Sequence, residues 1–251
     1  MKILVVEDKS ENLEAAKRAV LQFSEVEFEF LTSASQALGK IGKVDGIITD
    51  LFFPQEYDEK LNQEYQFYIE RFTNSSTIFQ VVVDEFYGND ISQATERLQE
   101  VVQMMREGNI QLSLQRVIER VKSYGYKDEE FLVATESVRK ALEASLSNPL
   151  FPYGAVLMLL AKAAGISHVL ITDLHRHANR YQTHSDSIDG MILLLPLIEE
   201  GVMTVQQAIV DGDGSTTYVG KHGLVCEEPF TSGKENPKSW VRAIRKVLAQ
   251  F

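Results

Sequence analysis

A short apolar run that ends in an aspartate is the feature that most limits how this chain can fold. Residues 46–49 read Gly-Ile-Ile-Thr, and Asp50 and then Leu-Phe-Phe-Pro at 51–54 follow them. Continuous rather than alternating hydrophobicity is typical of a parallel strand that is covered on both faces. Ligands of open α/β sheets bind at the carboxyl ends of the strands, so this position places Asp50 at a binding site. The alternative is that Asp50 caps the turn that follows.

A second apolar run of strand length occupies residues 2–6 and also ends in acid, at Glu7 and Asp8. If the two strands lie side by side and parallel, the three carboxylates converge at one edge of the sheet. Carboxylates this close repel each other unless a cation lies among them. A set of oxygen ligands suits Mg²⁺, which binds one or two carboxylates and keeps its waters for a phosphate. The sequence therefore predicts a magnesium site formed by Glu7, Asp8 and Asp50.

The composition excludes several classes of protein. With 251 residues the chain is long enough to bury a core as one large domain or two modest ones. Its net charge of -11 argues against a broad nucleic-acid surface and against attraction to anionic lipid. No run reaches the ~18 apolar residues of a membrane span, and no secretory signal opens the chain. The single cysteine, Cys226, excludes an internal disulfide and fits a reducing compartment. We therefore expect a cytoplasmic protein, and from its charge and hydropathy we expect it to bind neither nucleic acid nor membrane.

Strand and helix patterns alternate at both ends of the chain. Helical spacing of apolar residues spans 10–23 and 33–41, and the alternating apolar and acidic residues at 26–31 are typical of an edge strand. Together with the two buried runs, this predicts the order β-α-β-α-β for residues 1–54. After residue 148 the same style returns, and its predicted elements are a helix from Tyr153 to Gly165, a strand at 167–173, a helix at 186–200, strands at 216–219 and 223–226, and a last helix from Pro237.

Residues 55–148 differ from both ends. Glycine and proline nearly vanish, and apolar residues recur with a helical period over 57–72, 90–107, 110–124 and 128–147. This pattern predicts a small helical bundle or a long antiparallel hairpin. Residues 77–83 are the exception and are predicted as a short strand. The apolar stripes are typical of an internal core, and a homodimer formed through these helices is the alternative.

Taken together, these features resemble the receiver domain of two-component response regulators. The resemblance rests on the acidic pair Glu7-Asp8, on Asp50 in an Asp-x-x-x-Pro context, and on Thr172 near the end of the strand at 167–173. It covers residues 1–54 and 149–251, and it implies a doubly wound α/β fold with a five-stranded parallel sheet of order 2-1-3-4-5. Residues 55–148 would then be an all-helical subdomain inserted between strand 3 and helix 3.

The resemblance also implies a role for each site residue. Asp50 would be the phosphoacceptor and Thr172 the switch hydroxyl, while Phe52 would lend its backbone carbonyl to the Mg²⁺ held by Glu7, Asp8 and Asp50. The phosphoryl donor would be a histidine kinase or a phosphotransfer protein. The chain would be an acceptor rather than an enzyme, and its signal would leave through the helical insertion.

One position departs from the family's pattern. The family has a lysine directly before a proline after strand 5, whereas this chain has Glu228 before Pro229. That lysine neutralises the phosphoryl group through charge-assisted hydrogen bonds worth about 1.5–3 kcal/mol each. Lys221 or Lys234 would have to reach in from a neighbouring loop. If neither does, the alternative is a degenerate receiver that serves as a phosphorylation-independent protein–protein interaction module.

Overall fold

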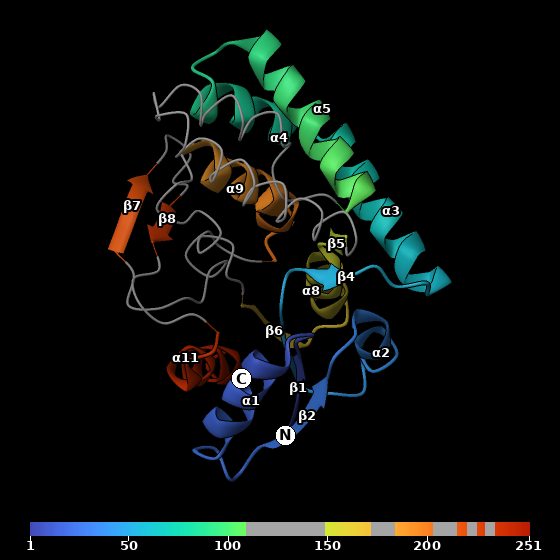
Figure 1. Ribbon diagram of the computed structural model, residues 1–251, viewed down its shortest axis with the longest axis vertical. Helices are drawn as coiled ribbons and strands as arrows, with labels where there is room; N and C mark the ends of the chain where they lie inside the picture. Colours follow the sequence, from blue (N-terminus) through green and yellow to red (C-terminus); the bar gives the residue numbers. More distant parts are fainter. Residues whose placement is uncertain (109–148, 172–183, 203–214, 220–224, 229–233) are drawn as a thin grey trace, which may run out of the picture.

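Four parallel strands form the centre of the fold in the computed structural model (Figure 1). The structure describes residues 1–108, 149–171, 184–202, 215–219, 225–228 and 234–251. The strands follow the order β2-β1-β3-β6, with β1 at Lys2–Val6, β2 at Glu27–Leu31, β3 at Gly46–Thr49 and β6 at Ser167–Leu170. The predicted α/β class with a parallel sheet is therefore confirmed, while the five-stranded order stays a prediction.

The register of the strands brings their carboxyl ends level with one another. Val6 pairs with Thr49 on one side and with Leu31 on the other, and Thr49 in turn pairs with Leu170. The apolar runs of β1 and β3 are buried, because helices cover both faces of the sheet. The edge strand β2 is only partly buried, as its alternating acidic residues predict.

Alternate residues of each central strand face two different helical layers. Ile3 and Val5 share an apolar cluster with α1 (Ser10–Val20) and α11 (Pro237–Leu248). Leu4 and Val6 belong to a second cluster with α2 (Ala34–Leu38) and α8 (Tyr153–Ala163) on the other face. Helices on both faces of a parallel sheet make this a doubly wound arrangement. The four predicted helices at these positions are confirmed.

Further helices lie between two short strands that pair with each other. The chain leaves the sheet through β4 (Phe53–Pro54) and returns through β5 (Leu150–Phe151), which runs antiparallel to β4. Between them come α3 (Glu59–Asn74), α4 (Ser76–Val81), the π-helical turn η1 (Val82–Phe86) and α5 (Ile91–Glu107). Buried residues of these helices belong to the same apolar cluster as Leu4 and Val6. The predicted segments 110–124 and 128–147 lie outside the described residues.

The strand predicted at residues 77–83 is wrong, because this stretch forms α4 and the start of η1. Ser75 caps the helix by accepting a hydrogen bond from the Ile78 backbone N–H. Ile78 and Val82 are both buried and lie four residues apart, on one helical face. Tertiary burial of that face therefore outweighs the strand preference of a run rich in β-branched residues.

The C-terminal half adds one long helix and one separate pair of strands. The predicted helix at 186–200 is confirmed as α9 (His184–Glu199), which contains Pro196. β7 (Ser215–Val219) and β8 (Val225–Glu228) pair with each other in an antiparallel two-stranded sheet. Among the helices in the described part of the chain, none has the length and apolar character that crossing a membrane requires.

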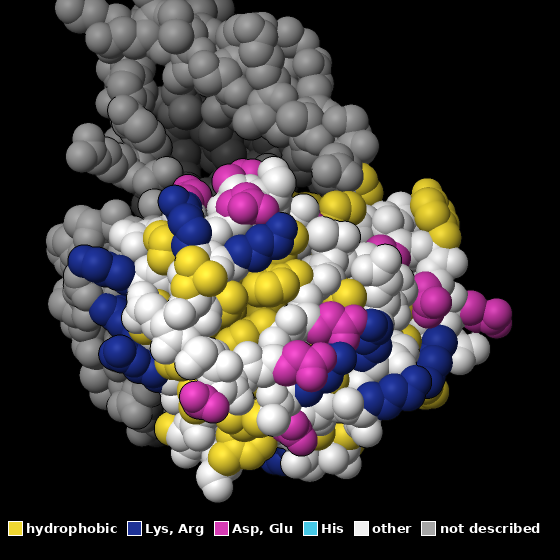
Figure 2. All heavy atoms as spheres, turned by 90° about the horizontal axis from the view of Figure 1, so that it is seen from below, with side chains coloured by type: hydrophobic (Ala, Val, Ile, Leu, Met, Phe, Trp, Pro, Cys, Tyr) yellow, Lys and Arg dark blue, Asp and Glu magenta, His cyan; other side chains and the backbone are white. Residues whose placement is uncertain are grey.

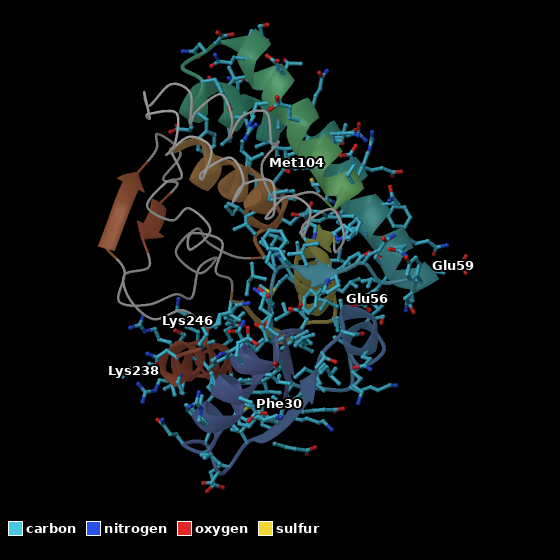
Figure 3. The ribbon with its side chains drawn as sticks, viewed as in Figure 1. Phe30, Glu56, Glu59, Met104, Lys238 and Lys246 are labelled. Atoms are coloured by element: carbon cyan, nitrogen blue, oxygen red, sulfur yellow. The ribbon has the colours of Figure 1, made fainter. Side chains whose placement is uncertain are left out.

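Acidic and basic side chains are mixed on the face that lies away from α4 and α5 (Figure 2). At the edge of the sheet, Lys2 Nζ lies 3.0 Å from carboxylate oxygens of both Glu27 and Glu29. Figure 3 shows Lys238 and Lys246 on α11. A charged edge strand discourages pairing with a strand of another chain.

Candidate metal centre

The ends of β1 and β3 carry three carboxylates to one edge of the sheet. The backbone ladder continues one residue beyond β3, since Asp50 N donates to Val6 O at 2.9 Å. This places Asp50 beside Glu7 and Asp8, and one carboxylate oxygen from each of the three lies within 4.8 Å of the other two. We call Glu7, Asp8 and Asp50 the carboxylate cluster. Their predicted convergence is confirmed, and their role as metal ligands stays a prediction.

Two members of the carboxylate cluster are almost completely buried. Glu7 is 0% exposed and Asp50 is 4% exposed, whereas Asp8 is only partly buried. Each buried acid also accepts a hydrogen bond from nearby backbone, Glu7 Oε1 from Lys9 N at 3.1 Å and Asp50 Oδ1 from Leu51 N at 2.7 Å. These local bonds fix the direction of both carboxylates.

A lysine from the far end of the chain enters the carboxylate cluster. Lys234 Nζ lies 2.8 Å from Glu7 Oε2 and 2.6 Å from Asp50 Oδ2, and the lysine is 2% exposed. In the receiver pattern a lysine directly precedes a proline, and at that position this chain has Glu228. The lysine that reaches Asp50 is instead Lys234. Lys234 was one of the two lysines named from the sequence as able to reach in, and it stands three residues before Pro237, where the last helix begins.

Burial and mutual repulsion control the protonation of the carboxylate cluster. Burial, followed by the charge of Asp50, raises the pKa of Glu7 to about 7, although the Lys234 ammonium acts in the opposite direction. The pKa of Asp8 is also raised by burial and by Asp50, against the opposing charge of Lys234. One ammonium does not balance three carboxylates, so the cluster retains an excess of negative charge when it is fully ionised.

The carboxylate cluster fits a hard cation such as Mg²⁺. Asp8 Oδ1 is buried and has no hydrogen-bond partner among the described residues. A buried polar atom without a partner costs about 1–3 kcal/mol, and more when it is charged. A cation among these oxygens would remove that cost for Asp8 Oδ1, and oxygen ligands are the ones that Mg²⁺ prefers. Glu7, Asp8 and Asp50 are the residues that would hold it.

A close backbone contact connects the carboxylate cluster with the start of α8. Gly154 N donates to Leu51 O at 3.0 Å, and a Cβ atom at residue 154 would collide with the backbone carbonyl of Asp50. Only glycine permits this approach. Sequence reasoning identified Gly154 as part of a helix start and missed its role at the site, because the contact joins residues about a hundred positions apart.

The remaining predicted site residues are placed only in part. Phe52 is half-buried and lies between β3 and β4, two residues after Asp50. Ile171 N donates to Thr49 O at 2.9 Å, which carries the chain along β6 as far as the same edge of the sheet. Thr172, the predicted switch hydroxyl, and Lys221 lie outside the described residues.

Comparisons of this chain with protein-family models, with curated proteins and with solved structures found no match.

Proposed function

We propose that this chain is a receiver-like signalling protein in which Asp50 accepts a phosphoryl group in the presence of Mg²⁺. The observation that carries the proposal is the convergence of the carboxylate cluster at one sheet edge, with Lys234 bonded to Asp50. A nucleophilic carboxylate, two further metal ligands and a buried ammonium are the groups that phosphoryl transfer to an aspartate requires.

The chemistry of the transfer follows from the bonds of Asp50. Leu51 N–H holds Oδ1, so Oδ2 is the oxygen that attacks the phosphorus of a phosphohistidine, after the Lys234 ammonium has moved off it. The new O–P bond forms as the P–N bond breaks, and the donor imidazole leaves with that electron pair. Lys234, 2.6 Å from Oδ2, then donates to an oxygen of the transferred group. Mg²⁺, when bound, offsets negative charge on the phosphoryl oxygens.

The proposal includes the fold and the setting that accompany this chemistry. The sheet has five parallel strands of order 2-1-3-4-5, of which β2-β1-β3-β6 are the first four, and residues 55–148 form the inserted helical subdomain. Phe52 supplies a backbone carbonyl to Mg²⁺, and Thr172 is the switch hydroxyl. The donor is a histidine kinase or a phosphotransfer protein, the location is cytoplasmic, and a homodimer through the inserted helices is part of the proposal.

A chain of hydrogen bonds supports signalling through the inserted helices. Tyr153, which precedes the Gly154 contact with Asp50, donates its hydroxyl to Asn62 Oδ1 on α3 at 3.0 Å. Asn62 Nδ2 donates in turn to the backbone carbonyl of Glu56 at 3.0 Å. We call Tyr153, Asn62 and Glu56 the relay. Its bonds join the stretch next to Asp50 with the first inserted helix.

The last member of the relay also holds α2. The Glu56 carboxylate accepts hydrogen bonds from Ala34 N at 2.6 Å and from Ser33 Oγ and Ser35 N at 3.0 Å. Figure 3 shows Glu56 above α2, where the chain runs from β4 toward α3. A carboxylate at the first turn of a helix is favourable, because the free backbone N–H groups point toward it. A shift of β4 would therefore move Glu56, whose hydrogen bonds connect it to both α2 and α3.

The degenerate receiver is a second candidate, and the burial of the acceptor favours it. Asp50 is 4% exposed, and both of its carboxylate oxygens already have partners. A phosphoryl donor has to displace Lys234 or move part of the chain before it reaches Oδ2. In this second candidate the bonded cluster is a fixed structural core, and partners bind the fold regardless of phosphorylation.

Beryllofluoride separates the two candidates, because it imitates a phosphoryl group on an aspartate only where the metal and the acceptor are both in place. We expect the wild type with Mg²⁺ to give a bound signal by fluorine NMR, and Asp50→Ala to give none. We also expect amide hydrogen exchange to change at 50–56 and 59–74 in the wild type alone. A wild type that binds no beryllofluoride, with exchange identical to that of Asp50→Ala, would favour the degenerate receiver.

A further inference from the structure

The backbone that carries Lys234 lies outside the sheet strands, so something else must hold it in place. In the family's pattern the lysine directly precedes a proline, whereas here Glu235 and Asn236 separate Lys234 from Pro237. A lysine side chain is long and flexible, and it keeps one geometry only if its backbone is fixed. Lys234 nevertheless reaches both Glu7 and Asp50 with short ion pairs.

The support comes from the first turns of α11. Trp240 is 0% exposed, and its indole Nε1–H donates to the backbone carbonyl of Lys234 at 2.7 Å. The indole ring belongs to the apolar cluster that α1 and α11 form with Ile3 and Ile48 on the sheet. Lys234 is therefore tied at both ends, its carbonyl to a tryptophan in the core and its ammonium to two acids at the sheet edge.

We infer that Trp240 is a positioning residue that holds the Lys234 backbone so that the ammonium reaches Glu7 and Asp50. The inference rests on the proposed function for its consequence in phosphoryl binding, but the positioning itself is a property of the ligand-free protein. It explains how a lysine outside the family's usual position serves the same acceptor aspartate.

A purely structural role for the same bond leads to a different expectation. A buried indole N–H needs an acceptor, and any nearby carbonyl satisfies it. In that case removal of the N–H would lower stability while the ammonium kept its place between the two acids. The test therefore has to observe the ammonium itself.

The presence of a single tryptophan allows the indole N–H of Trp240 to be removed without changing any other residue. Because Trp240 is the only tryptophan in the chain, biosynthetic replacement of tryptophan by benzothienylalanine changes this residue alone. The analogue has a sulfur atom in place of the N–H and almost the same shape, so the core remains filled. Trp240→Phe is the encoded counterpart. Tyr68→Phe is the matched control, since it removes a buried hydroxyl that donates to the Leu193 carbonyl, away from the carboxylate cluster.

The primary measurement is ¹⁵N NMR of the lysine ammonium groups without metal or ligand. A buried, ion-paired ammonium exchanges slowly with water, and Lys234→Met identifies its signal by deleting it. We expect exchange of this signal to be about fivefold faster in the benzothienylalanine protein and in Trp240→Phe, the factor that one ordinary hydrogen bond provides. Tyr68→Phe should leave it unchanged.

A second measurement uses beryllofluoride and Mg²⁺ on the same proteins, and we expect weaker binding whenever the Trp240 N–H is absent. A wild type that fails to bind beryllofluoride would contradict the proposed function and leave the ammonium result standing. Wild-type ammonium exchange in the folded benzothienylalanine protein would overturn the positioning role.

Discussion

At the scale of single residues, burial makes the ion pairs of Lys234 far more sensitive to substitution than ion pairs at the surface. Lys234→Met would leave Glu7 and Asp50 buried without their counter-charge, and we expect a loss of about 3–5 kcal/mol in the free energy of unfolding. Lys17→Met is the matched control, because Lys17 pairs with Glu14 at a solvent-exposed site, where such pairs contribute about 0–1 kcal/mol. Urea unfolding at pH 7 measures both, and equal losses would contradict the burial argument.

Glu7 gives the carboxylate cluster a dependence on pH. Its pKa is raised from 4.5 to about 7 in the folded chain, mainly by burial, so the folded state holds this proton more tightly than the unfolded state. The corresponding stabilisation is complete below pH 4.5 and is lost as pH rises through 7. We expect the metal-free wild type to lose stability over this window relative to Glu7→Gln. Urea unfolding with a chelator from pH 4.5 to 8 tests this, and parallel curves for the two proteins would contradict it.

Residue identity at the site was predictable only where a strand fixes the position. Glu7, Asp8 and Asp50 follow apolar runs, and parallel pairing of those runs brings the acids together. Lys234 was one of two candidate lysines, but its ion pair with Asp50 joins segments distant in the chain, so the sequence did not select it over Lys221. The Gly154 contact with Asp50 is also distant in the chain, and no local pattern encodes it. The receiver pattern pointed to Glu228, because in that pattern the lysine directly precedes a proline. In this chain two residues separate Lys234 from Pro237.

At the scale of elements, the start of α8 is fitted closely to the end of β3. Gly154→Ala would push a Cβ atom into the Asp50 carbonyl, and overpacking of this kind costs about 1–3 kcal/mol. Gly39→Ala is the control, because residue 39 has a right-handed helical backbone and the nearest atom to an added Cβ lies 3.7 Å away. There we expect no loss, or a gain of about 0.4–1 kcal/mol. Thermal or urea unfolding compares the two, and similar effects would contradict the close fit.

Most elements of the described chain follow from the period of their hydrophobic residues, and the one element predicted wrongly depends on tertiary packing. The buried runs, the acidic edge strand and the long amphipathic helices are each decided by their own residues. Residues 77–83 form helix because Ile78 and Val82 are buried against neighbouring helices, which a strand-like composition does not reveal. The runs at 216–219 and 223–226 were predicted as strands, and β7 and β8 confirm them, but composition does not specify that these two strands pair with each other.

At the scale of the whole molecule, the helices α3, α4 and α5 and one face of the sheet share a single apolar core. The relay adds polar contacts from the Asp50 side of that core to α3. Tyr153→Phe removes one hydroxyl and keeps the ring, so we expect beryllofluoride still to bind while the exchange response of residues 59–74 shrinks. Tyr65→Phe, which removes the hydroxyl bonded to the Met105 carbonyl, is the control. An undiminished response in Tyr153→Phe would show that the relay does not carry the signal.

Intact mass spectrometry shows whether Asp50 in the carboxylate cluster accepts a phosphoryl group, as we propose. The protein is incubated with Mg²⁺ and acetyl phosphate, with parallel samples containing a chelator and the Asp50→Asn variant. We predict the addition of one phosphoryl group to the wild type with Mg²⁺ and none in the other two samples. An unmodified wild type, or equal modification of Asp50→Asn, would contradict the account.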